Sequence, residues 1–185
     1  MAKYNVYRIK VTLKHSKPPI WRRIEVPGNI TLARLHRILQ ETMGWEDYHL
    51  HQFAVGKTYY GIKHPDEEIW ESETLDESGV SLMRLAPAEK FKFVYEYDFG
   101  DGWEHTLLVE KILPPEEGVR YPRCVAGKLA CPPEDVGGMW GYYEFLQSIT
   151  DPKHPRHDEL LEWIGGHFDP DEFDLDDINK RLKRL

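Results

Sequence analysis

The sequence predicts an α+β fold, and three stretches of the chain carry this prediction. Residues 4–55 read in the order strand, strand, helix, strand; residues 91–112 read as a central β-hairpin; and residues 142–185 show helical spacing. Hydrophobic residues make up 41% and aromatic residues 12% of the chain, which is enough for a sizeable core. We therefore expect a single domain over residues 1–185, with a mixed or antiparallel sheet and helices packed mainly from the two ends of the chain.

Two strands are expected at the start of the chain, over residues 4–14 and 20–26. Apolar side chains alternate with basic or polar ones along residues 4–14, which is typical of a strand that is buried on one face. The segment Lys17-Pro18-Pro19 separates the two strands, because proline has no N–H to donate to a sheet.

A helix is predicted over residues 32–43, and a third strand over residues 48–55. Thr31 has a side chain suited to an N-cap, because its hydroxyl can accept a hydrogen bond from the first turn. Gly44 is a natural helix stop, because glycine readily adopts the left-handed conformation. These elements complete the strand–strand–helix–strand unit.

The central hairpin joins two strand-like runs within residues 91–112. Asp101-Gly102 is the sequence signal of a tight type I′ turn, because that turn needs positive φ at both central residues. With these two residues at the turn, His105 is expected to lie opposite Phe99.

The tip of this hairpin is expected to gather a dense group of functional side chains. Asp98, Asp101, Glu104 and His105 lie there, beside Trp103. Carboxylates and imidazole can bind a divalent cation, and a carboxylate–histidine pair can act as a general base. The alternative is that the aspartates and glycines only shape the turn and that the histidine fills a sheet position.

Further candidate ligands lie outside the hairpin. His49 and His51 are expected on the same face of a strand, where two imidazoles would form half of a metal site; the alternative is a structural role for both. Glu134 and Asp135 follow a pair of prolines. If the hairpin tip serves a ligand, its side chains should converge on a cavity shared with His49, His51 or Glu134.

The rest of the chain is expected to contain a long loop and several helices. Residues 113–141 hold many prolines and glycines and are predicted to form an ordered loop. A short helix is expected within residues 74–85. Apolar spacing indicates three C-terminal helices, over residues 142–149, 158–164 and 175–185.

Cys124 and Cys131 are the two cysteines of the chain, and three states are open to them. A disulfide is disfavoured under reducing conditions. A structural zinc site needs four ligands, for which Glu134 and Asp135 are the local candidates. We therefore favour two reduced thiols that pack the loop against the central hairpin.

The formal net charge of −8 argues against a protein that coats DNA. Residues 1–44 are nonetheless basic, with nine Lys and Arg against two Glu. A strand face in this region can contact nucleic-acid phosphates, with a tryptophan as a stacking group; it comprises Arg8, Lys10, Lys14, Trp21 and Arg23. The alternative is that this basic part attracts the acidic remainder of the chain within one fold.

The expected location is the cytoplasm, without a membrane partner. No apolar run reaches the roughly 18 residues that a membrane-spanning helix needs. The N-terminus also lacks the apolar region of a signal peptide. The sequence contains no P-loop, HExxH motif or dinucleotide-binding fingerprint, so these common enzyme classes receive no support.

Several sequence blocks resemble the Ri-plasmid Orf-three-like domain family, which is also described as an insertion-element passenger protein. They lie at residues 18–45, 95–110 and 131–142, in the HLHQF segment at 49–53 and in the C-terminal FDPDEFD segment. Relatives often carry a cysteine where Val136 stands, so a site with three thiols is not expected here. The resemblance implies an α+β domain associated with plasmids and mobile elements, and it supplies no particular activity or cofactor.

Two functional hypotheses follow from the sequence. The first is a small cytoplasmic binding or accessory module, with a small ligand or a protein as its partner. The second is a metal-dependent hydrolase that acts on a phosphate ester or nucleic acid, with a divalent metal as cofactor. An enzyme of this kind needs clustered ligands in an open cleft, whereas a binding module needs only a surface.

Overall fold

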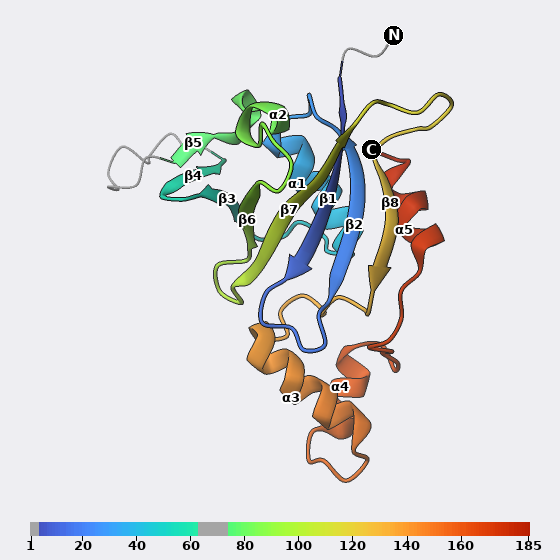
Figure 1. Cartoon of the computed structure of the whole chain (residues 1–185). Coiled ribbons are helices and arrows are strands. Elements are labelled where there is room, and N and C mark those ends of the chain that lie inside the picture. The colour runs from blue at the N-terminus through green and yellow to red at the C-terminus, as the bar shows by residue number, and fades with distance from the viewer. Residues whose placement is uncertain (1–3, 63–73) are drawn as a thin grey trace.

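One eight-stranded sheet organises the structure (Figure 1). The computed structural model describes residues 4–62 and 74–185. Neighbouring strands are antiparallel except β4 and β5, which are parallel. The order across the sheet is β5-β4-β3-β6-β7-β1-β2-β8. The strands are β1 (Val6–Leu13), β2 (Trp21–Pro27), β3 (His51–Val55), β4 (Thr58–Gly61), β5 (Thr74–Asp76), β6 (Lys92–Tyr97), β7 (Trp103–Leu113) and β8 (Arg123–Lys128).

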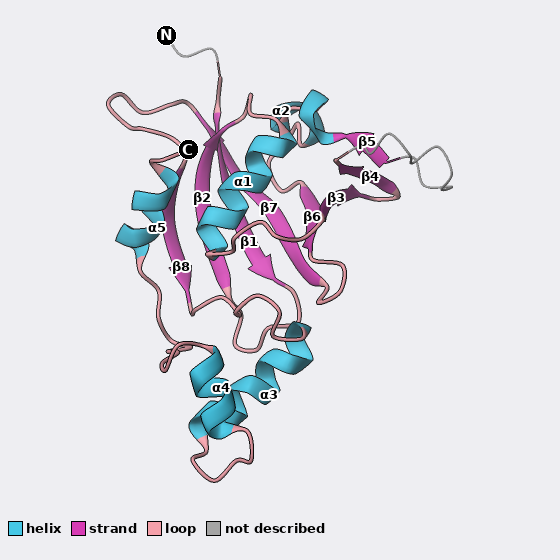
Figure 2. Cartoon of the chain, turned by 180° about the vertical axis from the view of Figure 1, so that it is seen from behind, coloured by secondary structure: helices cyan, strands magenta, loops and turns pink. Residues whose placement is uncertain are grey.

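The helices leave one face of this sheet uncovered. Figure 2 shows α1 across one face, α5 beside β8, and α3 and α4 beyond the end of the sheet. Among residues 4–62 and 74–185, no helix has the length and apolar character needed to cross a membrane. The helices are α1 (Leu32–Met43), the short 3-10 helix η2 (Glu77–Gly79), α2 (Leu82–Leu85), α3 (Gly138–Thr150), α4 (His157–Trp163) and α5 (Leu175–Leu182).

The N-terminal strand–strand–helix–strand unit is confirmed, and α1 has the bounds that the sequence predicts. The Thr31 hydroxyl accepts a hydrogen bond from the Arg34 N–H at 3.2 Å. Gly44 ends the helix at φ 90°, where its N–H donates to the Gln40 carbonyl. The third strand of the unit does not lie beside β1, however, because the β6–β7 hairpin occupies the space between them.

The predicted alternation along β1 decides which face of the sheet is buried. Tyr7, Ile9 and Val11 are buried in the core, together with the apolar face of α1. Arg8 and Lys10 lie on the opposite, uncovered face. We call this second face the outer face of the sheet.

The central hairpin forms, but the predicted pairing of its strands is wrong. His105 lies opposite Tyr95, not Phe99, because the strands end at Tyr97 and Trp103 rather than at an Asp101-Gly102 turn. The connection is a longer loop over residues 98–102. Asp98 opens it at φ 55°, and the Asp98 carbonyl accepts a hydrogen bond from Gly102 at 2.6 Å. An aspartate tolerates this left-handed conformation because its short side chain bonds the local backbone.

Strand β8 lies within the segment that the sequence analysis treats as a loop. It forms the edge of the sheet beside β2, and α5 packs on it. The strand was missed because its sequence, RCVAGK, contains little β-branched character and an interior glycine. That glycine, Gly127, is required by space: a Cβ there would lie 2.3 Å from the Phe173 ring.

The predicted C-terminal helices are present, with shifted boundaries. The first begins earlier, at Gly138, and the other two are α4 and α5. The region predicted as one short helix within residues 74–85 instead contains β5, η2 and α2 in succession. Part of the preceding segment lies outside the described residues.

Candidate functional site

Three loops meet at one end of the sheet. They are residues 46–50 after α1, residues 98–102 at the tip of the β6–β7 hairpin, and residues 134–140, which run from the loop before α3 into its first turn. Both cartoon views place the hairpin tip and the start of α3 at the same end of the sheet (Figures 1 and 2). We call these three segments together the acidic loop surface.

Hydrogen bonds join each loop of this surface to the other two. The loop after α1 accepts a hydrogen bond from the hairpin tip, at 2.8 Å, and donates one to the segment before α3, at 3.0 Å. The second and third loops are joined at 3.1 Å. These bonds run from Asp98 N–H to the Leu50 carbonyl, from Glu46 N–H to the Glu134 carboxylate, and from Gly137 N–H to the Asp101 carboxylate.

One histidine and two carboxylates converge where the loops meet. His49 Nε2 lies 3.0 Å from Asp135 Oδ1 and 3.7 Å from Asp98 Oδ2. The three potential ligand atoms all lie within 4.8 Å of one another. The Nε2 atom is shielded from solvent, and it makes no hydrogen bond of ordinary geometry with the described part of the chain. This group, the His49–Asp98–Asp135 triad, has the chemistry of a divalent-cation site.

The backbone holds both carboxylates of the triad in a conformation that is uncommon outside glycine. Asp98 and Asp135 have φ values of 55° and 58°. Asp98 Oδ1 accepts a hydrogen bond from Gly100 N–H at 2.9 Å, which stabilises the turn. That bond leaves Asp98 Oδ2 directed toward His49. The same aspartate therefore shapes the turn and contributes to the triad.

Tyr97 holds the backbone at Tyr48 and His49 in place. Its hydroxyl accepts hydrogen bonds from the N–H groups of Tyr48, at 3.0 Å, and His49, at 3.3 Å. The same hydroxyl donates to the Glu134 carboxylate through a short hydrogen bond. Burial, followed by the hydrogen bond to Glu134, raises the pKa of Tyr97, so the hydroxyl keeps the proton that it donates. Glu134 thus supports the triad from a neighbouring position.

A second group of ligand-type side chains lies in the core, beneath α1. The potential ligand atoms of His36, Asp47 and His51 also lie within 4.8 Å of one another. The rings of His36 and His51 are stacked, with planes only 2° apart. Lone pairs of imidazole lie in the ring plane, so two parallel stacked rings cannot direct them at one ion. We therefore interpret this group as a hydrogen-bond network.

The hydrogen bonds of this core network define the protonation of His36. Gln40 donates to the Tyr95 hydroxyl at 2.8 Å, so the Tyr95 proton is free to go to His36 Nδ1, also at 2.8 Å. His36 then carries its own proton on Nε2 and donates it to Asp47 at 2.7 Å. Burial, and then the proximity of His51, lowers the pKa of His36 to about 4, in agreement with a neutral ring.

The structure separates the eight candidate ligands of the sequence analysis. His49, Asp98 and Asp135 form the triad, while Asp101 and Glu134 lie beside it on the acidic loop surface. His51 belongs to the core network, where its Nε2 lies 2.9 Å from Glu77. The expected pair of imidazoles from His49 and His51 is not formed, because β3 begins only at His51 and His49 lies in the preceding loop.

The two remaining candidates do not lie at the hairpin tip. Glu104 lies on the outer face and pairs with Lys14 at 2.5 Å. His105 is completely buried between Trp45 and Tyr95, and both of its ring nitrogens lack a hydrogen-bond partner among the described residues. Burial lowers the pKa of His105 to about 4. Both residues are displaced from the tip because the hairpin loop is longer than predicted.

Sequence reasoning missed the exposed aromatic side chains of the acidic loop surface. Trp140, in the first turn of α3, is 84% exposed, and Tyr48, in the first loop, is 73% exposed. Phe99, at the hairpin tip, is also exposed. Their only sequence signal is adjacency, since each stands close to a candidate ligand or to the glycine pair before α3.

The two thiols are free, and their environment differs from the predicted one. Cys124 is buried on β8 beside α5. Cys131 Sγ accepts a hydrogen bond from Arg22 Nη2 at 3.1 Å and lies 3.6 Å from Met43 Sδ. The thiols therefore pack against β2, α1 and α5, and not against the central hairpin. Within the described residues, neither thiol belongs to a group of three potential metal ligands.

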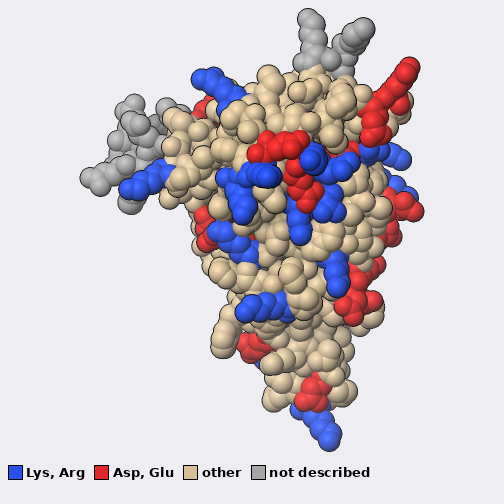
Figure 3. All heavy atoms as spheres, viewed as in Figure 1, with Lys and Arg blue, Asp and Glu red and all other residues tan. Residues whose placement is uncertain are grey.

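The predicted nucleic-acid face is the outer face of the sheet, and its charges are compensated. Figure 3 shows carboxylates lying among the Lys and Arg side chains of this face. Arg8 pairs with Glu25 at 2.7 Å, and Arg23 pairs with Glu110 at 2.6 Å. Lys10 and Arg23 both lie over the Trp21 ring, and Lys14 pairs with Glu104. Each of these basic side chains therefore has a partner within the fold, as the alternative of attraction within one fold expects.

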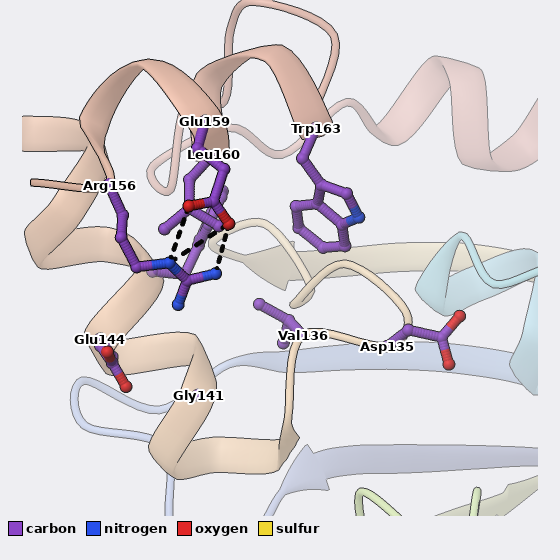
Figure 4. A pocket seen from close by; sticks show the side chains of 9 residues that line it. Asp135, Val136, Gly141, Glu144, Arg156, Glu159, Leu160 and Trp163 are labelled. Atoms are coloured by element: carbon purple, nitrogen blue, oxygen red, sulfur yellow. Dashed lines mark hydrogen bonds and ion pairs between the residues drawn. The ribbon is translucent and has the colours of Figure 1, made fainter.

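A small cavity adjoins the acidic loop surface between α3 and α4. Its volume is about 280 Å³, and Leu160 and Trp163 contribute apolar walls. Arg156 and Glu159 form an ion pair at its side, at 2.7 Å. Figure 4 shows that the carboxylate of Asp135 points away from this cavity. The carboxylate of Asp135 therefore belongs to the triad, and the cavity is lined mainly by residues of α3 and α4.

Comparisons with known proteins agree over almost the whole chain. The family model described as plasmid pRiA4b ORF-3-like protein matches residues 5–177. "Uncharacterized protein y4hQ" of Sinorhizobium fredii (strain NBRC 101917 / NGR234) is 43% identical over 183 residues, which cover 98% of this chain and 92% of that protein. A crystal structure of MM3350, a protein of unknown function from Methanosarcina mazei Go1, matches with a TM-score of 0.84 and 38% identity. That match covers 95% of this chain and 98% of the other.

Proposed function

The chain belongs to the plasmid pRiA4b ORF-3-like protein family, and from this premise we propose that it is a binding module that holds a divalent cation between His49, Asp98 and Asp135. The y4hQ and MM3350 relatives carry no named activity in their descriptions, so the proposal rests on the triad. We also infer a cytoplasmic location, which the two free cysteines support.

The position of His49 Nε2 is the observation that carries this proposal. The nitrogen is shielded from solvent, lies between two carboxylates at 3.0 and 3.7 Å, and makes no well-directed hydrogen bond to either. A neutral imidazole that donates a proton would align with one carboxylate. A nitrogen that offers its lone pair to a shared cation needs no such alignment. One imidazole with two carboxylates suits Zn²⁺ or Mn²⁺.

Direct measurement of bound metal tests the proposal. The full chain, first treated with a chelator, is titrated with Zn²⁺ or Mn²⁺ in a calorimeter, and the bound metal is measured after gel filtration. We expect one equivalent per chain. Asp135→Asn and His49→Ala should each abolish this binding, and Asp135→Asn should leave the fold intact because the side chain is 66% exposed.

A matched control separates the triad from other histidines of the chain. His167 is exposed in the segment after α4, so His167→Ala should bind one equivalent as the original chain does. Absence of bound metal in the original chain, or equal loss in His167→Ala, would contradict the proposal. In the first case, His49 would be only the centre of an ion pair with the two aspartates.

The metal-dependent hydrolase remains the second candidate, because three protein ligands leave coordination positions open for water. The surroundings favour the binding module, since the nearby cavity of about 280 Å³ receives no carboxylate from Asp135. The metal-loaded chain should therefore leave a phosphate diester and single-stranded nucleic acid intact. Hydrolysis that is lost in Asp135→Asn but retained in His167→Ala would establish the hydrolase instead.

A further inference from the structure

We propose that the acidic loop surface docks a segment of another protein that is rich in lysine and arginine. This inference goes beyond the cation site, because it concerns the side chains around the triad and a macromolecular partner. It rests on two independent features, an excess of uncompensated carboxylates and a group of exposed aromatic side chains.

The charge of this surface is not balanced within the fold. Its three loops contain six carboxylates and no lysine or arginine. Within the described part of the chain, no lysine or arginine forms an ion pair with any of the six; the charged-type contacts they make are with His36 and His49. The carboxylates are those of Glu46, Asp47, Asp98, Asp101, Glu134 and Asp135.

The outer face of the sheet differs from the loops in its charge pairing. There, Glu25, Glu104 and Glu110 each pair with an arginine or a lysine. A divalent cation in the triad would offset the charges of its two aspartates only. Glu46 and Asp101 would still have no cationic partner on this surface. A cationic partner from outside the chain would complete the charge balance.

Exposed apolar side chains are concentrated on the same three loops. Among the described residues, nine large hydrophobic side chains are exposed, and four of them belong to these short segments. They are Tyr48, 73% exposed, Leu50, 52%, Phe99, 50%, and Trp140, 84%. Clustered exposed apolar groups mark interaction sites. Aromatic rings also attract lysine and arginine through their faces, so they complement the carboxylates for the same partner.

The surface is preformed, which lowers the entropic cost of docking. Each loop is bonded to both others, and the Asp101 carbonyl lies so close to Gly138 that a Cβ there would be only 2.5 Å from its oxygen. Glycine is thus needed for the contact between the hairpin tip and the start of α3. The backbone segments that carry the carboxylates and the aromatic side chains are therefore held together before a partner arrives.

The negative charge of this surface also disfavours other binding partners. Nucleic acid and anionic lipid carry phosphates, which the carboxylates repel. A second copy of the chain that used the same patch would place like charges opposite each other. A basic protein segment is the occupant that both features favour.

A labelled synthetic peptide rich in lysine and arginine tests this docking, and a peptide of equal length with glutamine at those positions is the control ligand. We expect fluorescence anisotropy to show binding of the basic peptide only. Binding should weaken as salt rises, because the carboxylates are exposed to screening ions. The measurement is made both with a chelator and with added Zn²⁺, so that failure of the cation site is recorded separately from failure of docking.

Paired variants locate the binding. Phe99→Ala with Trp140→Ala should weaken binding about tenfold, because two cation–π contacts are lost. Glu46→Gln with Asp101→Asn should weaken it by a similar factor. Tyr59→Ala is the matched aromatic control, and Glu117→Gln with Glu172→Gln is the matched charge control, since these residues are exposed elsewhere.

Three results would overturn the proposal. Equal weakening by the surface variants and the control variants would show attraction to the net charge of the whole chain alone. Binding of neither peptide would remove the docking role. Concentration-dependent dimers that become monomers in Phe99→Ala with Trp140→Ala would identify a second copy as the occupant; gel filtration with light scattering measures this directly.

Discussion

The imidazole rings of His36 and His51 stack in the core, with their centroids 3.4 Å apart and their planes 2° apart. His36 belongs to α1 and His51 to β3, so the stacked pair joins the helix to the sheet. Two protonated rings would repel each other at this distance. The burial that lowers the pKa of His36 to about 4 is therefore part of how this contact is maintained.

Tyr95 connects this histidine pair to α1, and Tyr95→Phe should destabilise the fold. The hydroxyl accepts a hydrogen bond from Gln40 and donates one to His36. Its removal leaves two buried polar groups without a partner, which costs about 1–3 kcal/mol. Chemical denaturation monitored by circular dichroism measures the loss. Tyr59→Phe, at an exposed position of β4, is the control and should leave stability within about 0.5 kcal/mol.

Stability should fall as the pH decreases from about 6.5 toward 4, and His105 should be a principal cause. Burial lowers the pKa of His105 to about 4 in the folded state, whereas an unfolded histidine titrates near 6.5. The unfolded state therefore binds the proton first, and the stabilisation present above pH 6.5 is lost as the pH falls through this window. The full difference corresponds to about 3 kcal/mol.

The variant His105→Leu should flatten this pH dependence without a large loss of stability at neutral pH. Neither ring nitrogen makes a hydrogen bond of ordinary geometry among the described residues, so only weaker contacts with the backbone of Tyr95 and Trp103 would be lost. The dependence of stability on pH that remains in this variant should come mainly from His36, because its pKa is also lowered in the folded state. Thermal unfolding at several pH values measures both effects. An unchanged slope in His105→Leu would show that His105 does not titrate in this window.

Elements with strong local signals could be predicted from the sequence. Helix α1 has both caps and an apolar stripe, and its bounds agree with the prediction. Strand β8 could not be found in this way, because Gly127 is favoured by the approach of Phe173 from a distant segment. The hairpin was recognised, but its five-residue loop is bonded through Asp98 to Leu50 in another loop, a contact that no local pattern reveals.

The candidate site was predictable only as a list of residue types. His49, Asp98 and Asp135 were all among the candidates, yet they come from three loops that are distant in sequence. The sequence could not separate them from His105 and Glu104, because a longer hairpin loop decides which side chains remain at the tip. The exposed aromatic residues were missed, since exposure in a loop has no periodic signature.

Glu25 is expected to contribute to stability from the outer face of the sheet. Its carboxylate is buried and accepts hydrogen bonds from Arg8, at 2.7 Å, and Arg123, at 2.6 Å. Burial by itself would raise the pKa of Glu25, but the two arginines bring it below its ordinary value. Glu25→Gln should cost about 2 kcal/mol, less than a fully buried pair because both arginines reach solvent.

Glu104→Gln is the matched control for this ion-pair network. Glu104 pairs with Lys14 on the same face, but its side chain is 42% exposed, so the change should cost less than about 1 kcal/mol. Urea denaturation of both variants provides the comparison. Equal losses would show that burial of the carboxylate does not set the strength of these pairs.

Asn179 on α5 should protect the free edge of the sheet at β8. Its side-chain amide donates to the Cys124 carbonyl at 2.9 Å and accepts from the Cys124 N–H at 2.9 Å, as a neighbouring strand would. Asn179→Leu keeps a side chain of similar size but leaves both backbone groups unpaired. We expect a loss of about 2–3 kcal/mol, because each unpaired buried group carries a desolvation penalty.

Hydrogen exchange distinguishes this specific role of Asn179 from a general weakening of α5. Asn179→Leu should speed up exchange of the Cys124 amide relative to the original chain. This increase should be larger than the increase at the amides that pair β2 with β8. Lys180→Ala, at the next position of the same helix, should change neither stability nor that exchange rate appreciably. If the Cys124 amide keeps its protection in Asn179→Leu, the edge is covered by the packing of α5 as a whole and the side-chain amide has no special part in it.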